Sequence, residues 1–328
     1  MSAGSGRRVS LEPARELVVL GQDDVRRLLD LDELVEALAA AFVELSEGRT
    51  SVPPRVAART GSGLLAAMPG YLPGSGLGAK LVTVFPGNHA AGLPSHLALI
   101  ALFDEKSGRA LAVMDGTHIT AVRTAAASAL STRLLARPES AILAILGAGV
   151  QGEAHLGALQ RVRTFQEVRI ASRSQDHAVA LAGTSPGARP VASFEEAVRG
   201  ADVVCCCTDA GEPIIAFDWL ATGAHVTSIG SNQGGPELDA ETVRRGRLFV
   251  ESRVAFQPPP AGAAELAGLD PAQGTELGEV LAGKAAGRQS PEQVTVYKSM
   301  GHAVEDTAAA ALVYRRAVRE GAGQTVAL

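Results

Sequence analysis

The sequence predicts an α/β fold with a doubly wound parallel sheet in its second half and an α+β region in its first half. Before about residue 115, short apolar runs alternate with Gly and Pro, which is typical of antiparallel strands and tight turns. After Thr120, apolar strand-like runs alternate with helical patterns, which favours a parallel sheet with helices on both faces. A chain of 328 residues is long enough for about two domains.

The first half is predicted to hold helices and an antiparallel sheet. Apolar residues three and four positions apart after Asp23-Asp24 predict a helix. Short strands and turns are expected over Leu64–Pro86. A strand at His96–Phe103, a turn at Lys106-Ser107-Gly108 and a return over Ala110–Met114 predict a hairpin.

The second half opens with a predicted helix over Ala121–Ala136. Further helices are expected from about Val150, over Phe194–Arg199 and, at the end of the chain, over Glu305–Glu320. The Pro-, Ala- and Gly-rich segment Gln257–Gly274 is predicted to be a loop. Apolar runs predict the strands of the parallel sheet, and we expect no further strand after the last of them. The predicted strands are Ala141–Leu146, Val168–Ala171, Val203–Cys207, His225–Ile229 and Leu248–Val250.

Composition excludes several classes of protein. A net charge of −5 disfavours nucleic-acid binding through a basic surface. No apolar run approaches the roughly 18–20 residues of a membrane span. The segment Met1–Arg8 lacks the apolar core of a signal peptide and is expected to fray. We therefore expect a cytoplasmic protein with no nucleic-acid or membrane partner.

The three cysteines stand in one run, Cys205-Cys206-Cys207. Neighbouring residues of a strand point to opposite faces, so the three cannot chelate one metal ion, and the spacing does not form a disulfide framework. We interpret them as small buried residues and expect no metal.

A glycine-rich turn follows the first predicted parallel strand. The segment Gly147-Ala148-Gly149-Val150-Gln151-Gly152 has the pattern G-x-G-x-x-G between a strand and a helix. Gly147 permits a tight turn, Gly149 lets the backbone approach a pyrophosphate, and Gly152 lets helix and strand pack closely. The turn therefore predicts a dinucleotide site; the alternative is a connecting turn without a ligand.

The end of the next strand predicts which dinucleotide is preferred. An acid there would bind the ribose hydroxyls and repel a 2′-phosphate. Instead the chain reads Ser172-Arg173-Ser174, and a guanidinium flanked by hydroxyls suits a phosphate. We predict that NADP(H) is preferred over NAD(H); the alternative is that Arg173 is a solvated loop residue.

Several blocks besides the glycine turn carry a resemblance to a known family. They are distributed over most of the chain: Gly78–Thr83, Leu93–His96, Ala112–Gly116, Ile119–Ala126, Glu276–Val280, Lys298–Gly301 and Ala303–Asp306. With these blocks the chain, from about Val25 to Tyr314, resembles the ornithine cyclodeaminase/mu-crystallin family.

The resemblance implies a domain organisation and an activity. A Rossmann-like domain over residues 123–304 is expected inside a substrate-binding and dimerisation domain built from residues 1–122 and 305–328, in a homodimer. The implied enzyme is an NAD(P)H-dependent oxidoreductase that acts on the α-carbon C=N or C–N bond of a small amino or imino acid: a ketimine or cyclic imino acid reductase, or an amino acid dehydrogenase. The alternatives are an ammonia-releasing cyclodeaminase and a non-catalytic, crystallin-like binder.

Two basic residues match the family's substrate-binding positions. Arg55, after Pro53-Pro54, matches a carboxylate-binding arginine, with a surface arginine as the alternative. Only four of the 30 basic residues are lysine, and Lys80 lies in an apolar strand-like run. It matches the family's catalytic lysine, whose partner would be the substrate carboxylate or the imine nitrogen; the alternative is a side chain that snorkels to solvent. The resemblance also places Met68 and Met300 at the substrate.

The remaining matched positions concern the cofactor. Arg123 matches an arginine that contacts the cofactor phosphates. Ser95 and Ser299 match positions at the nicotinamide end, and Thr208 matches a cofactor contact. Ordinary turn hydrogen bonding is the alternative for the two serines.

The chain departs from the family in its acidic residues. Asn232 stands where cyclodeaminases have an acid/base Asp, which argues against cyclodeaminase chemistry because an amide exchanges no proton near neutral pH. No acid falls at the glutamate position of Val254–Pro260, and Glu265 aligns too loosely to carry a role. The proton donor thus stays open between Lys80, water and another residue. His302 is expected near the substrate side chain, where it would favour a polar or acidic group; the alternative is a satisfied histidine at a helix start.

Overall fold

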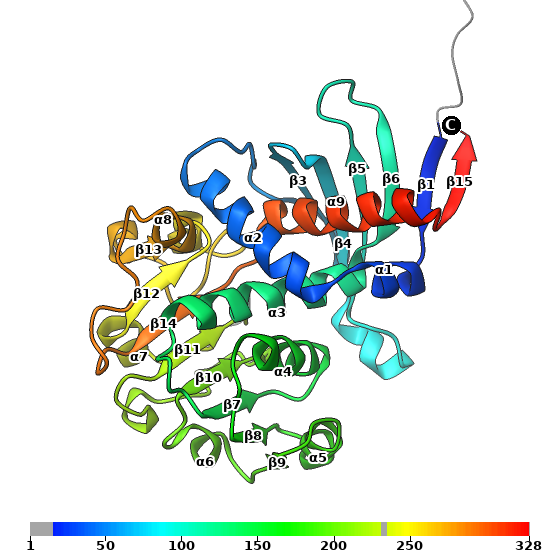
Figure 1. The fold of residues 1–328 in the computed structure, drawn as a ribbon. Helices are drawn as coiled ribbons and strands as arrows, with labels where there is room; N and C mark the ends of the chain where they lie inside the picture. The colour runs from blue at the N-terminus through cyan, green and yellow to red at the C-terminus, as the bar shows by residue number, and fades with distance from the viewer. Residues whose placement is uncertain (1–15, 231–234, 328) are drawn as a thin grey trace, which may run out of the picture.

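The computed structural model describes residues 16–230 and 235–327, which form two sheets with helices packed on them (Figure 1). One sheet has seven strands in the order β15-β1-β6-β5-β4-β3-β2, and the other has eight in the order β13-β12-β14-β11-β10-β7-β8-β9. The predicted frayed segment Met1–Arg8 lies outside the described residues. None of the described helices is long and apolar enough to cross a membrane.

The seven-stranded sheet is mostly antiparallel. Its strands are β1 (Glu16–Leu20), β2 (Val56–Arg59), β3 (Leu64–Leu72), β4 (Gly76–Val84), β5 (His96–Phe103), β6 (Ala110–Asp115) and β15 (Gln324–Ala327). The predicted hairpin is confirmed, because β5 pairs antiparallel with β6. Over the region predicted as short strands, the structure has two nine-residue strands, β3 and β4.

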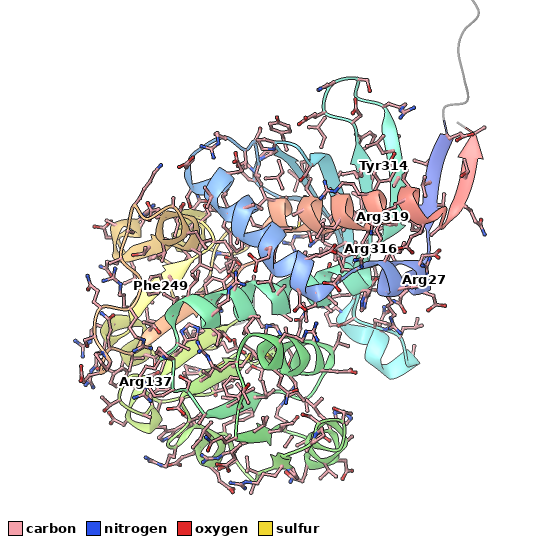
Figure 2. The ribbon with its side chains drawn as sticks, in the orientation of Figure 1. Arg27, Arg137, Phe249, Tyr314, Arg316 and Arg319 are labelled. Carbon is pink, nitrogen blue, oxygen red and sulfur yellow. The ribbon has the colours of Figure 1, made fainter. Side chains whose placement is uncertain are left out.

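One face of this sheet is covered by helices and the other is open. The long helix α9 (Ala303–Glu320) packs along β3 and β4, with α2 (Leu31–Ser46) beside it (Figure 1). At the far end of α9, Arg316 binds Glu33 of α2 at 2.8 Å (Figure 2). On the opposite face, leucines of three neighbouring strands remain exposed: Leu65, Leu77, Leu81, Leu97 and Leu99.

The helical pattern near the N-terminus belongs to two helices. Helix α1 (Gln22–Leu28) ends before Asp30, whose side chain accepts a hydrogen bond from the Glu33 amide and starts α2. An Asp at this position satisfies an amide that has no partner within the helix. A new helix therefore begins after Asp30, although the apolar spacing continues through it.

The eight-stranded sheet is parallel throughout its described pairings. Its strands are β7 (Ile142–Leu146), β8 (Glu167–Ala171), β9 (Ala188–Pro190), β10 (Val203–Cys206), β11 (His225–Ser228), β12 (Arg247–Val250), β13 (Gly274–Glu276) and β14 (Thr295–Lys298). The prediction that the sheet ends at Leu248–Val250 is wrong. Strand β14 lies between β11 and β12, and its Lys and Thr hid it from a search for continuous apolar runs.

Helices cover both faces of the parallel sheet. They are α3 (Gly116–Leu135), α4 (Val150–Val162), α5 (Gln175–Ala182), α6 (Phe194–Val198), α7 (Ala240–Arg245) and α8 (Leu277–Leu281), with short 3-10 turns at Phe217–Trp219, Arg253–Phe256 and Pro271–Gln273. A further 3-10 turn, Pro86–Ala91, connects β4 and β5 of the seven-stranded sheet. Helix α3 begins five residues before the prediction, because Asp115 caps it through the His118 amide.

The domain division stays a prediction. The expected boundary at residues 122 and 123 falls inside α3, which contacts both α2 and α4. The segment predicted as a loop, Gln257–Gly274, is largely irregular but is not merely a surface loop, because Ala263 and Leu266 are buried in the core.

Candidate functional site

The glycine-rich turn has the geometry that each glycine position predicts. Gly147 has a φ of +104°, and a Cβ there would lie 2.6 Å from the Cys207 carbonyl oxygen. A Cβ on Gly152 would lie 2.0 Å from the Gly147 carbonyl oxygen, so only glycine allows α4 to start this close to β7. A Cβ on Gly149 would meet no atom within 4 Å, so the backbone is open to a ligand there.

The first turn of α4 faces this opening. Gly149 occupies the N-cap and offers no side chain to the free amides of the helix, and Val150 is well exposed. Ala148, Val150 and Gln151 therefore surround a helix N-terminus whose amides are available to an anion. These residues fit the pyrophosphate of a dinucleotide.

The end of β8 presents the three residues predicted to select NADP(H). Arg173 is exposed and binds the equally exposed Asp209 at 3.0 Å. Ser174 caps α5 by accepting a hydrogen bond from the His177 amide. A pair this exposed is weak in water, so Arg173 can exchange Asp209 for a phosphate.

A second group of functional side chains gathers at the N-terminus of α9. The Nζ of Lys80, on β4, lies 2.8 Å from Asp306. Arg123, on α3, donates from Nε to Asp306 at 3.2 Å and from Nη1 to Glu305 at 3.1 Å. All four side chains are at most 5% exposed, so the structure unites four charges from three elements in one buried network.

Burial shifts the titration of this network. Desolvation lowers the pKa of Lys80 to about 8, although the charge of Asp306 acts in the opposite direction. Desolvation also raises the pKa of Glu305 to about 7, against the effect of Arg123. Both groups therefore titrate close to neutral pH, where proton transfer is most useful.

Arg55 lies at the edge of the same group but is held differently. Its Nη2 donates to the carbonyl oxygens of Gly301 at 3.1 Å and Met300 at 3.4 Å. Among the described residues it has no ion-pair partner. Gly301 has a φ of +70°, and a Cβ there would lie 2.5 Å from the guanidinium of Arg123, so two arginines converge on this glycine.

Glu251 closes the other side of the site and was missed by the sequence analysis. It follows β12 directly, is buried, and accepts hydrogen bonds from the Ser299 hydroxyl at 2.6 Å and from the amides of Met300 and Gly301. A small cavity of about 20 Å³ lies against Arg55, Glu251, Met300, His302 and their neighbours. An acid at the carboxyl end of a parallel strand was the signal that could have identified it.

Of the other predicted substrate residues, His302 lines this cavity. Met68 on β3 pairs with Lys80 across the sheet and is buried on the same face. The Nδ1 of His302 is buried, with no hydrogen-bond partner within residues 16–230 and 235–327. Burial lowers the pKa of His302 to about 4, so its ring is neutral at physiological pH. Asn232 lies outside the described residues.

The predicted cofactor residues are held by protein partners. Thr208 donates from both its amide and its hydroxyl to the buried Glu237, which also accepts from Ser228 and the Gly230 amide. Ser95 contacts the neighbouring His96 ring at 3.0 Å. The bonds of Arg123 go to α9, so its contact with cofactor phosphates stays a prediction, as do those of the two serines and Thr208.

A further lysine proves to be part of the core. Lys298 is fully buried on β14. Its Nζ donates to the Ser228 hydroxyl at 3.0 Å and the Gly230 carbonyl at 2.5 Å, and it pairs with Glu265 at 2.8 Å. Glu265, on the segment expected to be a loop, thereby anchors that segment to the central strand β14.

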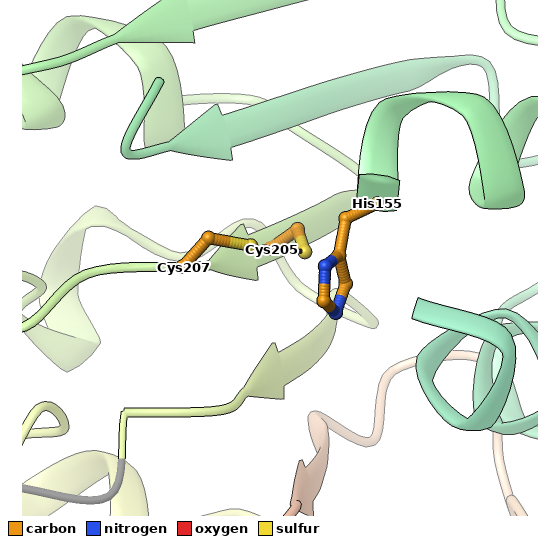
Figure 3. A group of neighbouring side chains, drawn as sticks. All are labelled: His155, Cys205 and Cys207. Atoms are coloured by element: carbon orange, nitrogen blue, oxygen red, sulfur yellow. Dashed lines mark hydrogen bonds between the residues drawn. The ribbon is translucent and has the colours of Figure 1, made fainter. Parts of the chain in front are cut away.

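The cysteines lie on both faces of β10. Cys205 and Cys207 share one face with His155 of α4 (Figure 3), while Cys206 packs into the core on the other. Both ring nitrogens of His155 are in hydrogen bonds, to the Gln151 carbonyl and the Ser128 hydroxyl. Burial raises the pKa of Cys206 and Cys207, which disfavours the thiolates that bind metals. The expectation of no metal stays a prediction.

The fold and the site together define a class: an α/β enzyme with a dinucleotide turn after β7 and a buried network of two cations and two acids at the N-terminus of α9. The chain belongs to the ornithine cyclodeaminase/mu-crystallin family, whose family model matches residues 15–321.

Similar proteins extend over most of the chain. Ketimine reductase mu-crystallin of Mus musculus is 41% identical over 89% of this chain and 94% of its own length. Alanine dehydrogenase of Archaeoglobus fulgidus is 33% identical over 95% of this chain and 98% of its own. The structure of Thermococcus litoralis Δ1-pyrroline-2-carboxylate reductase in complex with NADH and L-proline has a TM-score of 0.88 and 34% identity, covering 94% of this chain and all of that one.

These similarities confirm the predicted family and fold class. The chain is an NAD(P)-dependent oxidoreductase of the imine reductase and amino acid dehydrogenase type, with a Rossmann-like parallel sheet.

Proposed function

We propose that this chain reduces a preformed α-imino acid to the amino acid, with NADPH as the preferred cofactor. When bound, the reduced nicotinamide supplies the hydride for the α-carbon. The residues of the chain then have three tasks: to hold the substrate carboxylate, to supply a proton to the imine nitrogen, and to hold the cofactor phosphates.

The observation that carries this proposal is the different environment of two cations, the buried Lys80 and the partly buried Arg55. Lys80 is already neutralised by Asp306, whereas Arg55 is bound only to carbonyl oxygens. A substrate carboxylate gains most from the cation that lacks an anion, because its two oxygens match the fork of a guanidinium. Arg55 therefore binds the carboxylate, because Arg123 beside it is, like Lys80, already paired with acids.

The role that remains for Lys80 is that of proton donor. With a pKa of about 8 it is mostly protonated at neutral pH, yet it releases a proton far more readily than an exposed lysine. Hydride adds to the α-carbon while the imine nitrogen takes a proton from Nζ. The C=N bond becomes a C–N bond, and Lys80 regains its proton from solvent. Met68 and His302 border the space for the rest of the substrate.

The preference for NADPH rests on the end of β8. Arg173 and the hydroxyls of Ser172 and Ser174 offer donors and no acid within the same short turn. The measurement is the ratio of kcat/KM with NADPH and with NADH. An efficiency at least tenfold higher with NADH contradicts the preference.

The open face of the seven-stranded sheet supports a homodimer. Leu81 pairs with Leu99 across β4 and β5, and both project to the uncovered face. An apolar face of this kind is stabilised by a second protein surface. Sedimentation equilibrium gives the mass, and Leu81→Lys combined with Leu99→Lys is expected to yield monomers. A wild-type protein that is monomeric at micromolar concentration contradicts the dimer.

The decisive experiment is a panel of imino acids with NADPH. Δ1-Pyrroline-2-carboxylate and its six-membered homologue represent cyclic imines, while pyruvate and oxaloacetate with ammonia supply acyclic ones. Loss of NADPH absorbance together with formation of the amino acid supports the proposal. Ammonia release from ornithine with catalytic NAD, without imine reduction, would instead establish a cyclodeaminase.

A further inference from the structure

The contact between Lys80 and Asp306 joins two distant parts of the chain. The Nζ lies 3.0 Å from Oδ1 and 2.8 Å from Oδ2, so both carboxylate oxygens face the ammonium group. Each side chain is 2% exposed. A buried charge is strongly unfavourable without a partner, so each of the two groups stabilises the charged form of the other.

A second cation holds the carboxylate from the other side. Arg123 donates from Nε to Oδ1 of Asp306 and uses Nη1 to bind the adjacent Glu305. Asp306 would have to lose two ion pairs to turn away from Lys80. The carboxylate is therefore fixed more firmly than a single pair of flexible side chains could fix it.

The surroundings of Lys80 on its own sheet are apolar. Met68 on β3 and Ile100 on β5 are its cross-strand neighbours, and both are buried. The charged groups that face Lys80 come from the two helices packed on the sheet: the two acids of α9 and Arg123 of α3. Asp306 alone among them accepts a hydrogen bond from Nζ within the described residues.

We propose that Asp306 is a positioning residue for the reaction: it holds Nζ of Lys80 at one point and keeps it protonated until the imine nitrogen takes the proton. This inference rests on the proton-donor role of Lys80 in the proposed function. We assign Asp306 no contact of its own with substrate or cofactor, because its carboxylate is already bound by Lys80 and Arg123. After the transfer, the neutral amine of Lys80 stays beside the carboxylate, which favours its return to the ammonium form by a proton from solvent.

The pH dependence follows from the two opposing influences on Lys80. Burial lowers its pKa to about 8, and the charge of Asp306 opposes that shift. Because the protonated form donates, imine reduction is expected to fall as pH rises through this pKa. Removal of the Asp306 charge takes away the largest influence that opposes burial and moves the fall to lower pH.

The small number of lysines makes Lys80 directly observable. With lysine labelled by ¹³C at Cε, four residues give four NMR signals, and Lys80→Met identifies the one that matters. We expect its midpoint to move to lower pH by about 1 or more in Asp306→Asn. The matched control is Asp202→Asn, which removes an acid paired with Arg137 beside the parallel sheet (Figure 2). This control is expected to leave the midpoint of Lys80 unchanged. An unchanged midpoint in folded Asp306→Asn overturns the proposal.

A second variant tests position separately from charge. Asp306→Glu retains the carboxylate but displaces it by one methylene group. We expect the midpoint to stay near that of the wild type while kcat falls at least tenfold. Wild-type kcat in this variant overturns the positioning role. Because this test does not use Asp306→Asn, it still decides the question if Asp306→Asn does not fold.

The two readouts separate this inference from the proposed function. The NMR titration requires no substrate, so it reports on the Lys80–Asp306 pair even if every imino acid in the panel fails. Imine reduction whose pH profile does not follow the NMR midpoint would retain the proposed reaction and reject Lys80 and Asp306 as its proton-donating pair.

Discussion

The two halves of the site are built in opposite ways. The dinucleotide turn is local: six consecutive residues, from the end of β7 into the first turn of α4, provide its shape, and backbone groups provide its donors. The buried ionic network, with Arg55 beside it, is assembled from a segment before β2, from β4, from α3 and from α9, and side chains provide its charges. A local backbone site tolerates changes elsewhere in the fold, whereas an assembled side-chain site depends on how the two sheets pack.

The largest expected effect concerns the glycines of the local half. Gly152→Ala places a methyl group against the Gly147 carbonyl oxygen, so we expect a markedly lower melting temperature even without cofactor. Gly149→Ala is the matched control, because nothing lies near its Cβ. It is expected to keep the melting temperature but to lose the stabilisation that added NADPH provides. Equal behaviour of the two variants would contradict the separate roles of these glycines.

Lys80→Met tests the assembled half. Loss of the proton donor is expected to lower kcat by on the order of 10²-fold or more. Lys106→Met, in the β5–β6 turn, is the control and is expected to have wild-type kcat. Lys80→Arg adds a sharper question, because a guanidinium retains the charge but hardly releases a proton. Full activity of Lys80→Arg would exclude proton donation by this residue.

Arg55→Gln is expected to act mainly on substrate binding. Charge-assisted hydrogen bonds contribute about 1.5–3 kcal/mol, so KM should rise roughly 10- to 100-fold with a smaller change in kcat. Arg59→Gln, at the exposed end of β2, removes a nearby arginine outside the site and serves as control. A change confined to kcat would assign the carboxylate to a different cation.

The smallest effect is expected at Arg173. An exposed ion pair contributes up to about 1 kcal/mol, so Arg173→Ala should lower kcat/KM for NADPH about fivefold and leave that for NADH unchanged. The matched control is Arg244→Ala, another exposed arginine in a surface pair, on α7. An equal loss of kcat/KM with both cofactors would mean that Arg173 does not act through the 2′-phosphate of NADPH.

The sequence predicted the local half well and the assembled half only in part. The positions of Gly147, Gly149 and Gly152 encode the turn, so their spacing was sufficient. Arg55 and Lys80 were found through the family resemblance, because neither carries a local pattern. Glu251 and Asp306 were missed for the same reason: their importance arises from contacts between segments far apart in the chain. Strand β14 was missed because a central strand can carry a lysine when Glu265 neutralises its charge and Ser228 accepts a hydrogen bond from it.

The short connection between β14 and α9 has a consequence for which changes the chain can accept. Only residues 299–302 separate a central strand of one sheet from the helix that covers the other, and Met300, Gly301 and His302 among them line the small cavity beside Arg55. An α-helix turns by about 100° per residue, so one inserted or deleted residue here would rotate Glu305 and Asp306 to a different side of α9. The length of this link thus sets the angular phase of the helix, and the four-residue spacing is as much a part of the site as the side chains.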